Sequence, residues 1–160
     1  MRDKTVGWLF VVAQAVLLIA VVLLPAAEHW SRPLWLMTVA GICVVAGIVI
    51  AAVAALGLGT ALSATPVPNE VGELQTSGLF ALVRHPVYSG IMLAVAGAAL
   101  RSGNAVVAVV AALTIGFFPL KARWEERRLA QRYPGYQDYA ASTPRFVPRP
   151  ASLWRRQPAT

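Results

Sequence analysis

The stretch that decides the fold is VGWLFVVAQAVLLIAVVLLPAA, from Val6 to Ala27. It contains no charged residue, and Gln14 is its only strongly polar side chain. Crossing the hydrocarbon core of a bilayer takes roughly 20 apolar residues in a helix. The stretch therefore predicts a first membrane-spanning helix over 6–27, and not a cleaved secretory signal, whose apolar part is only about 7 to 15 residues long.

The rest of the chain follows the same pattern. It is 58% hydrophobic and 13% charged, with a mean hydropathy of +0.62, and this composition excludes an ordinary soluble domain. Further apolar runs predict spans at 33–59, 86–100 and 102–120, the last two joined by a turn-like Arg101-Ser102-Gly103-Asn104. We expect an all-α bundle of four transmembrane helices forming a single domain over 1–150, with a basic tail over 151–160.

The fourth predicted helix continues beyond the membrane. Helix-favouring residues extend to about Tyr133, where Pro134-Gly135 ends the pattern. A helix from Ser102 to Tyr133 would be about 48 Å long, against a hydrocarbon core of about 30 Å. Its last turns are therefore expected in the cytoplasm, with a kink at Pro119. The residues from 136 to 150 are expected to form an extended segment along the lipid headgroups.

The positive charges predict the orientation of the bundle. Of the 14 Lys and Arg residues, only Arg32 and Arg101 fall on one side of the four predicted spans. By the positive-inside rule both termini are cytoplasmic, in a multi-pass protein of the cell membrane. The net charge of +7 is then explained by topology and by contact with anionic lipids, and no nucleic-acid partner is expected. One cysteine and two histidines give no spacing for a metal cluster, so no metal is expected.

Arg84-His85-Pro86-x-Tyr88-x-Gly90 marks the start of the third predicted span. Pro86 suits the first position of a helix, where its missing N–H costs nothing. Arg84 and His85 then lie at the positive end of the helix dipole, which attracts carboxylate or phosphate groups. Tyr88 follows on the same helix face as His85. The pattern is typical of an anion-binding site, although the same residues also suit a helix end anchored among lipid headgroups.

Glu125 and Glu126 form a second candidate group near the end of the fourth helix. At about 100° per residue they lie on opposite borders of a face that is expected to contact protein. Both side chains could reach a pocket, or could form ordinary salt bridges with Lys121, Arg123 or Arg128 on their own helix. Spacing leaves both interpretations open.

Several short motifs are more specific together than any one of them is alone. Gly57-Leu58-Gly59, Arg84-His85-Pro86-x-Tyr88-x-Gly90, Glu125-Glu126-x-x-Leu129, Tyr136, Tyr139 and Phe146-Val147-Pro148 resemble the isoprenylcysteine carboxyl methyltransferase and phospholipid methyltransferase superfamily of integral membrane enzymes. The resemblance covers residues 57–148. It departs at Gly78-Leu79-Phe80, where the family often has a proline after the glycine, and the shape of that loop is therefore open.

The resemblance implies an S-adenosylmethionine-dependent methyltransferase with a cofactor pocket at the cytoplasmic face, closed by the Arg-His-Pro helix and the C-terminal segment. The expected cofactor-binding residues are Gly57, Gly59, His85, Tyr88, Gly90, Glu125 and Glu126. The expected substrate-binding residues are Arg84, Tyr136 and Tyr139. Arg84 and Glu126 are the expected catalytic residues, because an arginine can orient a carboxylate acceptor and a glutamate can take a proton from an amine.

The expected methyl acceptor is a lipophilic molecule from the bilayer, either a lipid or an isoprenoid with a carboxylate, thiol or amine group. Two alternatives remain open at the level of sequence. One is an NADPH-dependent, sterol-type membrane reductase, which has a related helical architecture. The other is a non-catalytic lipid-binding subunit that keeps the helices without the chemistry. The sequence gives no oligomeric state.

Overall fold

The computed structural model describes residues 2–59 and 74–149, and within them the chain is helical, without strands. The helices are α1 (Arg2–Leu23), α2 (Leu34–Leu58), α3 (Leu79–Leu82), α4 (Pro86–Ser102), α5 (Ala105–Arg132) and α6 (Tyr136–Ser142). The predicted all-α class is therefore confirmed. The predicted basic tail over 151–160, and most of the long connection between α2 and α3, lie outside the described residues.

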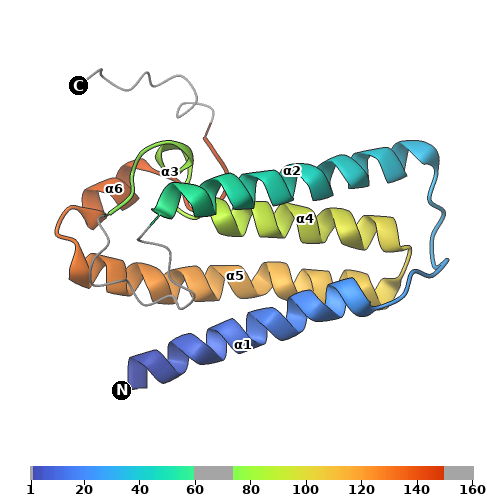
Figure 1. The fold of residues 1–160 in the computed structure, drawn as a ribbon, viewed down its shortest axis with the longest axis horizontal. Coiled ribbons are helices and arrows are strands. Elements are labelled where there is room, and N and C mark those ends of the chain that lie inside the picture. Colours follow the sequence, from blue (N-terminus) through green and yellow to red (C-terminus); the bar gives the residue numbers. More distant parts are fainter. Residues whose placement is uncertain (1, 60–73, 150–160) are drawn as a thin grey trace.

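Three of these helices are long and apolar enough to cross a membrane. They are α1 from Thr5 to Leu23, α2, and α5, each with a mean hydropathy of 2.0 or more over its apolar window. The third predicted span coincides with α4, which has only 17 residues and lies between α2 and α5 (Figure 1). The structure thus supports three spans by length and composition, and a crossing by α4 stays a prediction.

The ends of the helices follow local chemistry. α1 ends at Leu23, earlier than predicted, two residues before Pro25. α5 begins at Ala105 because the Asn104 side chain caps it by accepting a hydrogen bond from the backbone N of Val106 at 2.8 Å. Pro119 lies inside α5, and the helix continues past it to Arg132. The end of the long fourth helix was therefore predicted correctly, whereas its predicted start, Ser102, is the last residue of α4.

One prediction of local structure is wrong. Residues 136–142, expected to be extended, form the short helix α6. In the helix, the three-residue spacing of Tyr136 and Tyr139 brings both rings onto one face, with centroids 6.0 Å apart. The chain is non-helical after α6, over residues 143–149.

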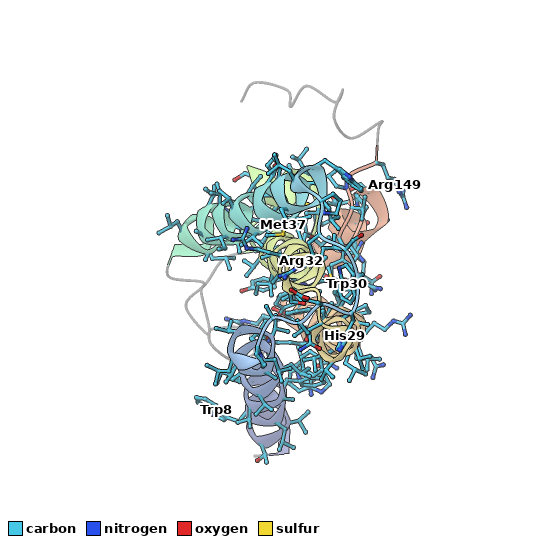
Figure 2. All side chains as sticks on the ribbon, turned by 90° about the vertical axis from the view of Figure 1, so that its right-hand side faces the viewer. Trp8, His29, Trp30, Arg32, Met37 and Arg149 are labelled. Carbon is cyan, nitrogen blue, oxygen red and sulfur yellow. The ribbon has the colours of Figure 1, made fainter. Side chains whose placement is uncertain are left out.

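Small residues let α2 and α4 pack backbone against backbone. A Cβ atom added to Gly90 would lie 2.5 Å from the carbonyl oxygen of Gly47, and one added to Gly97 would lie 2.6 Å from that of Ala40. Contacts of this kind are the usual basis of close helix packing in membranes, where apolar burial gives no driving force. α5 packs on the other side of α4 and α1 packs on α5, so the four long helices lie in the order α2, α4, α5, α1 (Figure 2).

The outward faces of the bundle are apolar. Trp8 is 56% exposed and points away from α1 (Figure 2), and Leu113 on α5 is 60% exposed. Exposed apolar faces on long helices suit contact with lipid tails.

The two ends of the bundle differ in chemistry. At one end, the α1–α2 connection is hydrogen-bonded to the α4–α5 turn: Ala27 N donates to Ser102 O, and Ala105 N donates to Nδ1 of His29, both at 2.9 Å. The other end gathers the end of α2, α3, the start of α4, the end of α5 and α6 (Figure 1). The charged motifs lie at this second end.

Candidate functional site

The site is built around the start of α4. His85 is the residue before the helix and Pro86 its first residue, as the sequence predicted. The backbone N–H groups of Arg84 and His85 donate to the carbonyl oxygens of Pro144 and Arg145, at 2.8 and 3.1 Å. The segment after α6 is thereby held against the start of α4.

The carboxylate of Glu126 is the centre of the site. Its Oε1 accepts hydrogen bonds from Nη2 of Arg84 at 3.0 Å and from Nε of Arg145 at 2.8 Å, and lies 3.1 Å from Nε2 of His85. Its Oε2 accepts from Nη2 of Arg145 at 2.5 Å. One carboxylate on α5 therefore joins the start of α4 to the C-terminal segment.

His85 lies between the two glutamates. Nε2 faces Glu126, and Nδ1 lies 3.8 Å from Oε2 of Glu125. That same Oε2 accepts a hydrogen bond from the Tyr88 hydroxyl at 2.7 Å. The rings of His85 and Tyr88 are stacked, 5.2 Å apart with an interplanar angle of 3°. Both neighbouring glutamates thus reach the start of α4, which the sequence alone left open.

Arg84, His85, Tyr88, Glu125, Glu126 and Arg145 are called the Glu126 cluster below. Its pairings run between elements, whereas the alternative for the two glutamates was salt bridging within their own helix. Arg128, one of the expected partners, has its guanidinium over the ring of Trp124, 3.1 Å from the centroid. Arg84 also donates to the carbonyl oxygens of Ala140 and Thr143, at 2.6 and 2.5 Å. The geometry therefore favours a shared site over ordinary salt bridges on one helix.

The two tyrosines of α6 lie next to the cluster. The Tyr139 hydroxyl donates to the carbonyl oxygen of Phe80 on α3 at 2.6 Å. Tyr136 is only 4% exposed, and its hydroxyl has no hydrogen-bond partner among the described residues. A buried hydroxyl without a partner is rare in proteins and calls for an explanation.

The electrostatics of the site are consistent with an ionised carboxylate. The hydrogen bonds to Glu126 raise the pKa of Arg145. Burial, together with the negative charge of Glu126, raises the pKa of Tyr136, and burial raises the pKa of Tyr139 to about 12. Both phenols are therefore neutral donors at physiological pH, beside a charged network.

The structure gathers most of the predicted site residues but not all. Arg84, His85, Tyr88, Glu125 and Glu126 lie in the cluster, with Tyr136 and Tyr139 beside it.

The three predicted glycines lie outside these contacts. Gly90 faces α2, where its missing Cβ makes room for the backbone of Gly47. Gly57 accepts a hydrogen bond from Nε2 of Gln75 at 3.0 Å, and Gly59 ends α2 with a φ of 48°. Among the described residues, none of the hydrogen bonds joins Gly57 or Gly59 to the cluster. Their cofactor-binding roles stay predictions.

Sequence reasoning missed Arg145. It was placed in a segment along the lipid headgroups, because nothing in its spacing relates it to Glu126, 19 residues earlier. The run Thr143-Pro144-Arg145-Phe146 could have indicated more, since prolines and aromatic residues hold a chain in one path. The hydroxyl of Ser89 on α4 donates to the carbonyl oxygen of Phe146 at 2.7 Å, which fixes that path.

The profile of the phospholipid methyltransferase family matches residues 35–135, more than half of the chain. The chain belongs to the phospholipid methyltransferase family. The resemblance noted from the motifs is thereby confirmed. The matched range includes α2, α4 and α5, and it ends just before α6 and Arg145.

Two curated relatives are also similar to this chain. The cobalt-zinc-cadmium resistance protein CzcN of Cupriavidus metallidurans is 41% identical over 83 residues, which are 51% of this chain and 38% of CzcN. The nickel-cobalt-cadmium resistance protein NccN of Alcaligenes xylosoxydans xylosoxydans is 33% identical over 86 residues, 53% of this chain and 40% of NccN. The matched part thus spans about two fifths of each relative.

Proposed function

We propose that this chain is an S-adenosylmethionine-dependent methyltransferase that acts on a lipophilic acceptor at the cytoplasmic face of the membrane. Membership of a methyltransferase family supports methyl transfer as the class of reaction. The observation that carries the proposal is the convergence of Arg84, His85 and Arg145 on the carboxylate of Glu126. A network this charged, held between helices of an apolar bundle, is expected to serve function.

The residues of the site fit the cofactor chemically. S-adenosylmethionine carries a carboxylate, an ammonium group, a sulfonium and a ribose. Arg84 and Arg145 supply donors for a carboxylate, and Glu125 and Glu126 supply negative charge for the ammonium and sulfonium. The buried Tyr136 hydroxyl, without a partner among the described residues, supplies a hydrogen bond that the protein itself leaves unused.

When bound, S-adenosylmethionine supplies a methyl group that forms a bond to the acceptor's lone pair while the electron pair of the broken S–C bond stays on sulfur. The residues of this chain bind, orient and exclude water, and alignment accounts for much of the acceleration. In this proposal Arg84 orients an anionic acceptor, and an amine acceptor loses its proton to one of the two neighbouring glutamates. His85 and Tyr88 are the residues of α4 that would hold the cofactor.

The proposed location at the cytoplasmic face rests on the positive-inside rule. From Lys121 onward, the positive charges of the described residues continue to Arg149. The start of α1 lies at the same end of the bundle as α6 (Figure 1). The start of α1, the cluster and the described residues after α5 therefore belong to one face in this proposal.

The two relatives are named as metal-resistance proteins, but our proposal includes no metal site. Within residues 2–59 and 74–149, no three His, Cys, Asp or Glu side chains lie together in a way that could hold a metal ion. The proposed activity rests on the family match, and no metal-binding role is proposed for this chain.

The test is cofactor-dependent stabilisation of the purified protein in detergent micelles. S-adenosylhomocysteine, the reaction product, should raise the unfolding temperature, and NADPH should not. His85→Ala should abolish the effect. The matched control is His29→Ala, which removes the other histidine at the opposite end of the bundle. Stabilisation by NADPH alone would support the reductase, and stabilisation by neither ligand would support a non-catalytic subunit.

A further inference from the structure

Three successive turns of α5 contact Tyr88 on α4. Its ring packs against that of Phe118, with centroids 5.0 Å apart, and Nζ of Lys121 lies 5.1 Å from the ring centre. The Tyr88 hydroxyl donates to Oε2 of Glu125 at 2.7 Å. Residues 118, 121 and 125 have the spacing of one helix face. The place of Tyr88, whose ring is stacked on that of His85, therefore depends on a row of α5 side chains.

Lys121 is in turn held by α1. Its Nζ donates to Oε1 of Gln14 at 2.5 Å, and Gln14 is the only strongly polar side chain of the apolar stretch from Val6 to Ala27. Lys121 is 4% exposed. A buried lysine in an apolar helix is costly and usually serves function. A chain of contacts thus runs from α1 through Lys121 to Tyr88.

The charge of Lys121 suits both of its neighbours in the site. An ammonium group within about 6 Å of a tyrosine ring is attracted to the face of that ring. Lys121 also interacts electrostatically with Glu125, one turn later on α5, and such attraction is stronger where water is excluded. The charge therefore favours the arrangement in which the Tyr88 ring lies near the ammonium group while its hydroxyl meets the carboxylate. An apolar side chain of similar length would fill the space without this selection.

Polar contacts also join helices in membranes, and in that role alone this contact would affect only stability. The packing of α1 on α5 has another basis, however. Phe10 on α1 contacts the rings of Phe117 and Trp124 on α5, with centroids 5.7 and 5.5 Å apart. A buried charge is not needed to hold α1 in place, whereas Lys121 reaches the ring of Tyr88. These contacts favour a role in the site.

We propose that Gln14 and Lys121 are positioning residues of the candidate site: Gln14 holds the ammonium group near Tyr88, and Lys121 keeps Tyr88 where it and Glu125 would contact the cofactor. α1 then takes part in the site, although it precedes residues 35–135, the range that matches the family profile. The inference deepens the proposed function and rests on it for the identity of the cofactor. The arrangement of the rings is independent of any cofactor, so the two proposals can fail separately.

The experiment uses the two histidines of the chain, His29 and His85, as reporters. Nuclear magnetic resonance of the full chain in detergent micelles, with isotopically labelled histidine rings, gives one ring signal for each. The His85 ring is stacked on that of Tyr88, with centroids 5.2 Å apart and an interplanar angle of 3°, so its signal changes when the tyrosine ring moves. His29 lies at the opposite end of the bundle, where it accepts from the backbone N of Ala105, and is the internal reference.

Lys121→Met should displace the His85 signal and leave the His29 signal in place, because the charge beside the Tyr88 ring is lost. Lys121→Arg should bring the His85 signal back toward that of wild type, since arginine keeps the charge. Gln14→Leu should displace the His85 signal by less, because the ammonium group remains but loses its hydrogen-bond acceptor.

Thr114→Val is the matched control. It removes another buried polar group of α5, whose hydroxyl donates to the carbonyl oxygen of Val110 on the same helix at 2.7 Å, and it should leave both signals unchanged. Should Lys121→Met fail to fold, Gln14→Leu, which alters α1 and leaves α4 and α5 intact, decides.

An unchanged His85 signal in the folded variants would overturn the inference. Equal displacement of both histidine signals would also overturn it, because the contact would then support the fold as a whole. S-adenosylhomocysteine affinity, measured on the same samples, should fall about three- to tenfold in Lys121→Met, as expected for the loss of one cation–ring contact, and should recover in Lys121→Arg.

Unchanged affinity in Lys121→Met, where wild type binds, would overturn the role of the pair in the site. Absence of binding by wild type would refute the methyltransferase proposal alone, and the His85 signal would still decide whether Gln14 and Lys121 position Tyr88.

Discussion

Arg145 and Glu126 form a two-point contact, with Nε of the arginine bound to Oε1 and Nη2 bound to Oε2 of the carboxylate. This pair fastens the segment after α6 to the end of α5. The same segment accepts hydrogen bonds from the backbone of Arg84 and His85. The segment is therefore held by this ion pair together with hydrogen bonds from Arg84, His85 and Ser89.

Replacing Arg145 should loosen this closure. Arg145→Ala should speed amide hydrogen exchange at Arg84 and His85 by about tenfold or more, because their acceptors lie in the released segment. Arg145→Lys should give an intermediate rate, since lysine keeps the charge but cannot bind the carboxylate at two points. The control Arg123→Ala should leave these rates unchanged. Unchanged rates in Arg145→Ala would show that the segment is held without the ion pair.

The two neighbouring glutamates should differ in their effect on stability. Glu126→Gln leaves two arginines without their counter-ion in a partly buried site. Since Arg145 is 30% exposed, we expect a loss near the low end for such pairs, about 2–3 kcal/mol in the free energy of unfolding. Glu125→Gln weakens mainly the hydrogen bond from Tyr88 and should cost about 1 kcal/mol. Denaturant unfolding followed by circular dichroism measures both, and equal losses would contradict the central role of Glu126.

Tyr136 and Tyr139 provide a matched pair on one short helix. Tyr139→Phe removes the hydrogen bond to Phe80 and should lower the free energy of unfolding by about 1 kcal/mol. Tyr136→Phe removes a hydroxyl that has no partner among the described residues, so stability should stay within about 0.5 kcal/mol of wild type. Its affinity for S-adenosylhomocysteine, measured by calorimetry, should nevertheless fall. A stability loss in Tyr136→Phe with unchanged affinity would assign that hydroxyl to the fold alone.

The glycine contacts between α2 and α4 should be sensitive to a single methyl group. Gly90→Ala would place a Cβ 2.5 Å from the carbonyl oxygen of Gly47, so the helices must move apart, at a cost of about 1–3 kcal/mol. Gly41→Ala on α2 is the control, because nothing lies within 4 Å of the added Cβ. The two variants are compared by their unfolding temperatures in the same detergent. Similar values would mean that the helices do not pack this closely.

Much of this fold could be predicted because a membrane-spanning helix can be recognised from the residues of the helix itself. Apolar length predicts a span wherever it is long enough, and Pro86 and Asn104 predict helix starts by the groups they lack or supply. The same argument is weaker for α4, because its 17 residues are fewer than the roughly 20 that a membrane-spanning helix usually has. α6 was missed because a helix of 7 residues depends on contacts with its neighbours.

The site could be predicted only in part, for a physical reason. His85, Tyr88 and the two glutamates lie within motifs that resemble those of a known family, and this resemblance, not their spacing alone, predicted a shared site. The position of Arg145 depends on the path of the chain after α6. The hydrogen bond from Lys121 on α5 to Gln14 depends on which face of α1 turns toward α5. Neither the path of the chain after α6 nor the orientation of α1 can be derived from the spacing of neighbouring residues. The structure was needed to place both residues.

Hydrogen exchange with mass spectrometry, on the full chain in nanodiscs with and without S-adenosylhomocysteine, tests the central claim most directly. The account predicts slower exchange at 80–90 and 136–147, the segments around the Glu126 cluster, and no change at 25–34 or 100–106 at the opposite end. Protection at the opposite end alone, or protection by NADPH in place of S-adenosylhomocysteine, would contradict it.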